Sequence, residues 1–145
     1  MSNIEYIIFE NQTLAIILRS QYKNEGIKFF TPNEFSQQLG YMNHPSGHVI
    51  IPHLHNSLPR EVKYTKEVIF IKSGKIRVDF YDNNKIYFES RILTKGDFLL
   101  LAFGGHGFEM LEKSELIEIK QGPYAGEADK TRFESINKKN IKINN

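Results

Sequence analysis

The chain has 145 residues, of which 40% are hydrophobic and 25% are charged, values typical of one soluble globular domain. Its formal net charge is only +2 and its Lys and Arg residues are scattered, which argues against nucleic-acid binding. The absence of cysteine excludes disulfides, thiolate metal sites and a cysteine nucleophile. We see neither a signal peptide nor a membrane-spanning apolar run, so we expect a cytoplasmic protein with no membrane partner.

The first forty residues contain short runs that are typical of β-strands. Residues 4–9 and 14–18 are rich in β-formers and are separated by the polar residues 10–12, which predicts an early hairpin. A further short strand is expected at 26–30. Residues 31–34 then have the order of N-cap, proline and N3 acid, which predicts a helix of only one or two turns.

Between residues 41 and 121, short apolar runs alternate with turn signals. Many short strands at such spacing indicate an antiparallel all-β sandwich or barrel and not a parallel α/β sheet. After residue 122 the pattern ends, and the Asn- and Lys-rich end is expected to be disordered. We therefore divide the chain into N-terminal strands (1–40), a β domain (41–121) and a C-terminal extension (122–145). The strands expected in the β domain cover residues 68–71, 76–81, 86–93, 98–101, 108–111 and 116–119.

Two histidines give the first indication of a metal site. His53 and His55 lie two apart in a segment with strand character, so both imidazoles are expected on one face. With one carboxylate and one more histidine they would make a ligand set suited to a divalent first-row metal. The alternative is a solvated strand end without a ligand. His44 is expected at the surface, and His48 should face away from His53 because its strand parity is opposite.

The spacing around these histidines resembles the first signature motif of the cupins, a family of small antiparallel double-stranded β-helix (jelly-roll) barrels. That motif has Gly, five residues, His-x-His, a short gap, Glu, six residues and Gly. The corresponding positions in this chain are Gly47, His53, His55, Glu67 and Gly74. Eleven residues separate His55 from Glu67, where the family usually has three or four, and this leaves Glu61 as an alternative to Glu67.

The second cupin motif has Gly, five residues, Pro-x-Gly, a short gap and His, and residues 96–106 resemble it. Ala102 replaces the usual proline, and His106 comes one residue early. The resemblance covers residues 41–121 and implies a cupin barrel to which the N-terminal strands are an addition. It also implies one bound divalent metal ion, which would be Zn, Fe, Mn or Ni. The implied ligands are His53, His55, Glu67 and His106.

The segment 56–66 lies beside the expected ligands in the sequence and is a place where specificity could arise. Tyr64, Glu61 and Lys63 are candidates for the group that transfers a proton during catalysis. Arg60 is a candidate for substrate binding. A longer hairpin without a functional role is an equally good interpretation of this segment.

Strand parity predicts that Phe108 and Met110 share the face of His106 and line an apolar pocket for a substrate. Packing in the barrel core is the simpler interpretation of both residues. Two other strands alternate polar with apolar residues, and we expect their polar rows on a solvated outer surface, unless they line the mouth of the barrel. These rows are Arg77 with Asp79 and Glu118 with Lys120.

A barrel with such a metal site can act as a Lewis acid or, with iron, as a redox centre. We expect a metal-dependent isomerase or epimerase that acts on a small polar metabolite, such as a sugar derivative of surface-polysaccharide metabolism. The alternatives are an iron-dependent dioxygenase and a non-catalytic cupin that binds a small molecule, because the fold alone does not select the chemistry. The N-terminal strands exceed what the barrel needs, so we also expect a homodimer.

Overall fold

The computed structural model describes residues 2–144, and its regular structure consists of antiparallel strands and two short 3-10 turns. The chain forms two compact units, one made of residues up to Tyr22 and from Tyr64 onward, the other of Lys23–Lys63. The prediction of an antiparallel all-β protein is confirmed. None of the three sheets of the described residues closes into a barrel. Within residues 2–144 no helix has the length and hydropathy required to cross a membrane.

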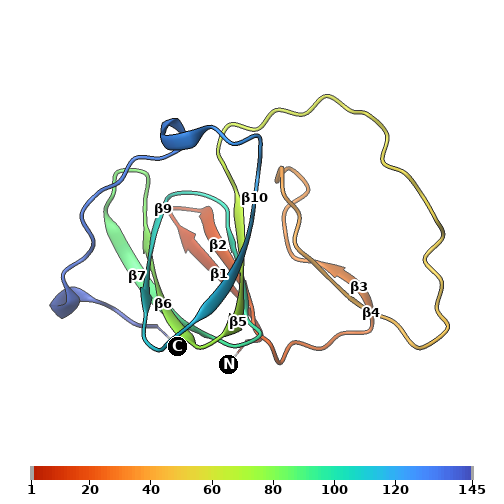
Figure 1. Cartoon of the computed structure of the whole chain (residues 1–145), viewed down its shortest axis with the longest axis horizontal. Coiled ribbons are helices and arrows are strands. Elements are labelled where there is room, and N and C mark those ends of the chain that lie inside the picture. The colour runs from red at the N-terminus through yellow and green to blue at the C-terminus, as the bar shows by residue number, and fades with distance from the viewer. Residues whose placement is uncertain (1, 145) are drawn as a thin grey trace. The chain divides into compact units, whose positions relative to one another are not determined.

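The larger unit contains two antiparallel sheets that face each other across one core (Figure 1). The five-stranded sheet has, in spatial order, β1 (Ile4–Phe9), β2 (Gln12–Leu18), β8 (Phe98–Leu101), β5 (Glu67–Ser73) and β10 (Glu115–Lys120). The three-stranded sheet has β7 (Tyr87–Thr94), β6 (Lys75–Tyr81) and β9 (Gly105–Met110) in that order. The strands predicted from the sequence in this unit are therefore confirmed to within three residues at each end.

The core of this unit is formed by alternate apolar residues along its strands, because successive side chains of a strand point to opposite faces. It draws on both sheets, so the two sheets bury each other's inner faces. Burial of this apolar area is the main stabilising contribution to the unit. The fully buried core members include Ile7, Ala15, Ile17, Ile71, Ile76, Val78, Leu93 and Leu99.

The N-terminal strands are an integral part of the larger sheet and not an addition to its outside. β1 and β2 form the predicted hairpin, whose turn residues Glu10 and Asn11 both have positive φ, as the tight hairpin turn requires. β2 then pairs with β8 from Ala15 to Leu18, so it lies between β1 and β8.

The smaller unit contains one antiparallel pair, β3 (Gly26–Phe29) with β4 (Gly40–Asn43). The short helix predicted after Thr31 is absent, and turns connect the two strands. The reason is that the expected N-cap has another partner. The Thr31 hydroxyl donates to the side chain of Gln38, whose amide in turn donates to the carbonyls of Pro32 (3.0 Å) and Phe35 (2.9 Å).

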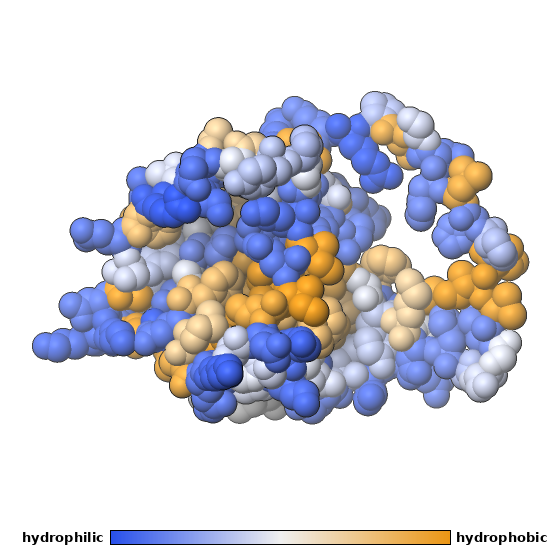
Figure 2. All heavy atoms as spheres, in the orientation of Figure 1, coloured by the Kyte–Doolittle hydropathy of each residue, from blue (hydrophilic) through white to orange (hydrophobic). Residues whose placement is uncertain are grey.

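The strand expected around His53 and His55 is not formed. Residues 48–63 have no regular secondary structure, and each of them is exposed. Val49 and Leu54 are 74% and 80% exposed, and Figure 2 shows orange side chains alternating with blue ones along this segment, which follows β4 in Figure 1. A strand needs a hydrogen-bonded neighbour to fix which side its residues face. The parity argument for the two histidines therefore has no basis in this segment.

The C-terminal end, which we expected to be disordered, is held against β7. Residues 122–144, which we name the C-terminal strap, contain two 3-10 turns, Gly126–Asp129 and Lys138–Asn140. The amide of Ser90 donates to the carbonyl of Lys142 at 2.8 Å, and the amide of Asn144 donates to the carbonyl of Ser90 at 3.1 Å. These bonds satisfy backbone groups at the edge of the three-stranded sheet, which explains why the strap is ordered.

The polar row Arg77 and Asp79 is buried, which contradicts its expected place on a solvated surface. Their side chains form a two-pronged ion pair, with Nε–Oδ1 and Nη2–Oδ2 distances of 2.8 and 2.9 Å. Arg77 also donates to Glu109 at 2.5 Å, and the hydroxyl of Ser90 donates to Asp79 at 2.5 Å. Arg77 and Asp79 are only 8% and 3% exposed. Mutual pairing removes the cost of burying these charges, which is why a polar row can lie below the surface here.

Candidate functional site

The larger unit contains a cavity of about 470 Å³ at one end of its two sheets. Its walls come from the start of β5, the ends of β6 and β8, the start of β9 and residues 129–135 of the C-terminal strap. This volume is in the range of small-molecule sites, roughly 300–1,000 Å³. The cavity contains Glu67 and His106, two of the four residues that the cupin resemblance implies as metal ligands.

The strand register brings these residues to the same end of the unit. Glu67 at the start of β5 is paired with Leu101 at the end of β8, and His106 on β9 is paired with Phe80 near the end of β6. Between β8 and β9 the chain turns at Gly104, whose φ is +75°. A Cβ atom there would lie 2.3 Å from the carbonyl oxygen of Tyr81, so only glycine allows this close approach.

Glu67 and His106 contact each other directly, with 3.1 Å between Oε2 and Nε2. The hydrogen bond from His106 lowers the pKa of the Glu67 carboxyl, burial opposes that shift, and the positive charge of Lys120 adds to it. Lys120 lies directly opposite Glu67 in the pairing of β10 with β5. The polar row of β10 therefore lies on the same face of the sheet as Glu67, although neither Glu118 nor Lys120 lines the cavity.

His53 and His55 belong to the smaller unit, whereas Glu67 and His106 belong to the larger one. The rings of His53 and His55 lie 5.4 Å apart between centroids in an edge-to-face arrangement, and Nδ1 of His53 lies 2.9 Å from the carbonyl oxygen of Ile51. The structure thus gathers the predicted ligands in two pairs. Among residues 2–144, no three His, Asp or Glu side chains form a metal-binding group. The four-ligand site stays a prediction.

The pair in the cavity has a spacing that fits metal binding. Two ligands that bind one first-row ion at roughly 2.0–2.2 Å have donor atoms about 3.0 Å apart at the octahedral angle and about 3.4 Å apart at the tetrahedral angle that zinc prefers. Nε2 of His106 and Oε2 of Glu67 are 3.1 Å apart. The donor types, one imidazole and one carboxylate, also suit a divalent first-row ion. The same separation equally serves the direct hydrogen bond.

The other predicted site residues do not all lie at the cavity. Tyr64 lines the cavity, and its ring contacts Phe103 edge to face at a centroid distance of 5.3 Å. Glu61 and Lys63 form an exposed ion pair of 3.9 Å in the smaller unit, and Arg60 there is exposed as well.

Neither Phe108 nor Met110 is among the residues that line the cavity. Phe108 packs against the core, while Met110 is 46% exposed at the far end of β9. For Phe108, the simpler interpretation of core packing is the one the structure bears out.

Sequence reasoning missed the contribution of the C-terminal strap. Lys130, Arg132 and Phe133 of the strap line the cavity together with Tyr81 at the end of β6. The ring of Phe133 packs edge to face on Tyr81 at 5.0 Å, and the Tyr81 hydroxyl accepts a hydrogen bond from the amide of Ile136 at 2.9 Å. One signal was present in the sequence, namely two basic residues beside an aromatic one in a segment without strand pattern.

Comparison of the chain with models of protein families, with curated proteins and with solved structures finds no match. The geometry of the cavity is therefore the basis for the functional argument that follows.

Proposed function

We propose that the protein is a metal-dependent enzyme of the cupin type that binds a small polar metabolite, such as a sugar derivative, and moves a proton on it as isomerases and epimerases do. The observation that carries this proposal is the Glu67–His106 pair inside a cavity of about 470 Å³. Such a cavity with a few convergent polar groups is the usual form of a small-molecule site.

The cupin jelly roll is part of the same proposal. Its support in the larger unit is the pair of antiparallel sheets around one core. A second support is the conformation of the motif glycines, since Gly47, Gly74 and Gly96 all have positive φ and mark turns.

In this proposal the divalent ion would be held by the four residues that the motif spacing selects, His53, His55, Glu67 and His106. A bound ion would polarise a carbonyl oxygen of the metabolite. Tyr64, which lines the cavity, is the residue we assign to proton transfer, with Glu61 and Lys63 as the alternatives from the neighbouring segment.

A second candidate function does not require a metal, and the 3.1 Å contact itself favours it. When Nε2 of His106 donates to the Glu67 carboxylate, Nδ1 keeps its lone pair and can accept a proton. The lowered pKa of Glu67, due first to the His106 hydrogen bond, keeps the carboxylate charged to orient the ring. The protein would then be an isomerase that uses His106 as a general base.

Elemental analysis of the purified protein tests the proposal. We expect one equivalent of zinc, manganese or nickel in the wild-type protein, and a loss of metal in the double variant His53→Ala/His55→Ala and in His106→Asn. The matched control is His44→Asn/His48→Asn, because these two histidines belong to the same unit, stack on each other and are not proposed ligands. Iron in place of the other metals would favour the dioxygenase alternative.

Proton exchange separates the catalytic candidates from a binding protein. In heavy water, an isomerase or epimerase introduces deuterium into a suitable sugar substrate, which proton NMR detects. Exchange without bound metal, lost in His106→Asn, would favour the general-base candidate and contradict the metal-dependent one. Metal binding without exchange on a panel of aldoses and ketoses would favour the non-catalytic alternative.

We also propose that the protein is a homodimer. Exposed apolar residues on the edge strands of the larger sheet support this, with Ile8 on β1 50% exposed and Ile119 on β10 57% exposed. Figure 2 shows a hydrophobic area in the middle of the view, over the part of the unit where Figure 1 draws β10. Light scattering that returns the mass of a single chain, 16.9 kDa, at micromolar concentration would contradict the dimer.

A further inference from the structure

We infer that the metabolite bound in the cavity carries an anionic group, a phosphate or a carboxylate, and that Lys130 and Arg132 of the C-terminal strap bind it. The inference deepens the proposed function and rests on it in one respect, since it takes the cavity to be the ligand site. It adds the charge of the ligand and the residues that recognise this charge.

Charged groups from the strands and from the strap line the same cavity. The strands contribute Glu67 and His106 to the lining, and the strap contributes Lys130 and Arg132 together with Asp129. A ligand in the cavity therefore has the reacting groups and two cations within one site. A phosphate or carboxylate would add a charged partner for Lys130 and compete with Glu127 for Arg132, whereas a neutral sugar would do neither.

Two acidic residues of the strap lie near the cations, and neither binds them strongly. The carboxylate of Asp129 accepts a hydrogen bond from the Thr65 hydroxyl at 2.5 Å, which ties the strap to the start of β5. Arg132 is paired with Glu127 through Nη1 and Nη2, and the two side chains are 70% and 72% exposed. Exposed pairs of this kind are worth about 0–1 kcal/mol, so an anionic ligand can replace Glu127 at little cost.

Lys130 is the less engaged of the two cations. Its ammonium makes no ion pair within 4.0 Å among the described residues 2–144; after the hydrogen bond from Arg132, its positive charge helps to lower the pKa of Glu127, whose backbone carbonyl accepts from the Lys130 amide at 3.4 Å. A flexible lysine and a planar arginine two residues apart offer a point charge and a fork of donors to one anion. This combination suits the oxygens of a phosphate and also those of a carboxylate.

The strap is fixed on both sides of these residues, so the backbone that carries the two cations is positioned before a ligand arrives. Asp129 is bonded to Thr65, and the amide of Ile136 donates to the Tyr81 hydroxyl at 2.9 Å. Between these points Phe133 packs on Tyr81. Preorganisation of this kind reduces the entropy that binding costs. Aromatic rings also line the cavity, namely Tyr64, Phe103, Tyr81 and Phe133, and provide apolar area for a ring-shaped ligand body.

Calorimetric titration with matched sugars tests the inference. The probes are D-glucose 6-phosphate, D-glucuronate and neutral D-glucose, with inorganic phosphate as the anion alone. We expect the phosphate or the carboxylate sugar to bind the wild-type protein at least tenfold more tightly than glucose. The two charged probes distinguish the two sources of negative charge, and inorganic phosphate shows whether the anion subsite binds without a sugar ring.

Charge-removing variants locate the binding group. Lys130→Ala and Arg132→Ala should each weaken the charged sugar at least tenfold and leave glucose unchanged, whereas Lys113→Ala, an exposed lysine in the turn between β9 and β10, should have no effect. Circular dichroism checks that each variant is folded. Equal binding of charged and neutral sugars, or equal weakening by Lys113→Ala, overturns the inference.

The same set of variants separates this inference from the proposed function. If the protein retains no metal and exchanges no substrate proton, yet binds the charged sugar through Lys130 and Arg132, the proposed function fails and the inference stands. If metal and proton exchange are present and Lys130→Ala and Arg132→Ala bind the charged sugar as the wild type does, the inference alone fails.

Discussion

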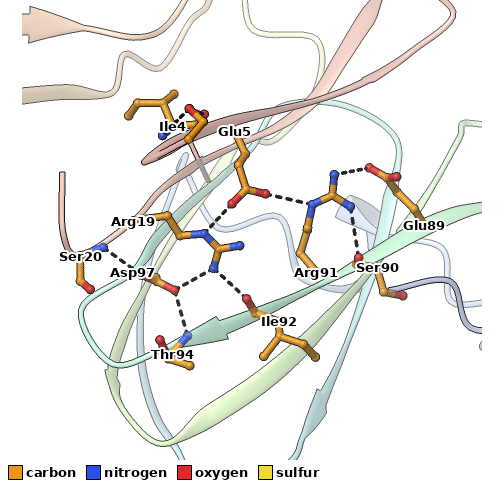
Figure 3. Close-up of polar contacts among 11 residues, drawn as sticks. Ile4, Glu5, Arg19, Ser20, Glu89, Ser90, Arg91, Ile92, Thr94 and Asp97 are labelled. Atoms are coloured by element: carbon orange, nitrogen blue, oxygen red, sulfur yellow. Dashed lines mark hydrogen bonds and ion pairs between the residues drawn. The ribbon is translucent and has the colours of Figure 1, made fainter. Parts of the chain in front are cut away.

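The two ends of the β-sandwich in the larger unit both contain acidic and basic residues, but they differ in whether these charges lie next to a cavity. β8 connects them, because Asp97 precedes its first residue and Leu101, its last, is paired with Glu67 in the cavity. The Asp97 end contains a network of five charged side chains, and each of them is paired with a side chain of opposite charge (Figure 3). At the cavity end, the paired groups Glu67, His106 and Arg132 line a cavity of about 470 Å³ together with Lys130.

The paired end is a chain of alternating charges. Glu5 on β1 accepts from Arg19 at 2.6 Å and from Arg91 at 2.9 Å, and Arg91 continues to Glu89. Arg19 also donates to Asp97 at 3.0 Å (Figure 3). These bonds use most of the donors and acceptors present, so they leave little capacity for a ligand. The comparison teaches that charge alone does not mark a site in this protein, whereas charge next to a cavity does.

The largest effect should come from Asp97, which is 1% exposed. Its carboxylate accepts from the amides of Ser20 and Thr94, both at 2.9 Å, in addition to Arg19. We expect Asp97→Ala to lower the free energy of unfolding by about 3–5 kcal/mol, because it removes the buried carboxylate that accepts from two amides and from the partly buried Arg19. Urea denaturation measures this. Asp97→Asn, which keeps one acceptor oxygen, should cost clearly less, and an equal loss in both variants would contradict the argument.

A smaller effect is expected where the C-terminal strap is attached. Tyr81→Phe removes the acceptor for the Ile136 amide and should cost about 1 kcal/mol, the usual net value of one hydrogen bond. The loss should appear mainly as local opening, so amide hydrogen exchange should accelerate at Ile136 and not at core residues such as Ile71. Unchanged exchange at Ile136 would show that the strap is held by its other contacts.

Glu67 should affect stability less than Asp97 and should do so in a pH-dependent manner. Glu67→Gln replaces a charge-assisted hydrogen bond with a neutral one, and we expect a loss of about 1 kcal/mol at neutral pH. The pKa of Glu67 is lowered below its ordinary value of 4.5, chiefly by the His106 hydrogen bond. The stabilisation is therefore present above that value and is lost as the pH falls through the lowered pKa. Urea titrations from neutral to acidic pH should show the wild type and the variant converge; a constant difference would contradict this.

The smallest effect is expected for an ion pair at the surface. Lys72 and Glu115 lie 3.1 Å apart, but their side chains are 56% and 59% exposed. Lys72→Ala should change the free energy of unfolding by no more than about 0.5 kcal/mol, and added salt should reduce even this. A larger loss in the same urea assay would show that exposure is a poor guide to the strength of the pairs in this fold.

The strands of the larger unit could be predicted because each has a short apolar period and a turn signal at its end. Residues 4–9 and 98–101 were placed at the observed positions. The region around His53 was not predictable in the same way, because a strand-like composition forms a strand only with a partner. The helix predicted after Thr31 is absent for a related reason. The hydroxyl expected to cap it donates instead to the side chain of Gln38, seven residues away in the sequence.

Of the residues that line the candidate site, some were selected from the sequence and others were missed. Glu67 and His106 were selected by motif spacing, and the structure places them in contact inside a cavity. The strap was missed because its residues have no periodic pattern, and its position depends on tertiary bonds to Tyr81 and Ser90. The burial of Arg77 and Asp79 was missed for the same reason, because alternation shows which residues share a face but not what later covers that face.

The position of β2 in the larger sheet has a consequence for how the chain folds. The hairpin of β1 and β2 can form in roughly 1–10 μs, since its partners are neighbours in the sequence. Leu18, however, pairs with Phe98, 80 positions later in the chain. Sheets that depend on such distant partners fold in roughly milliseconds to seconds. During that interval the apolar run from Leu14 to Leu18 stays exposed, so newly made chains should require dilution or a chaperone to avoid aggregation.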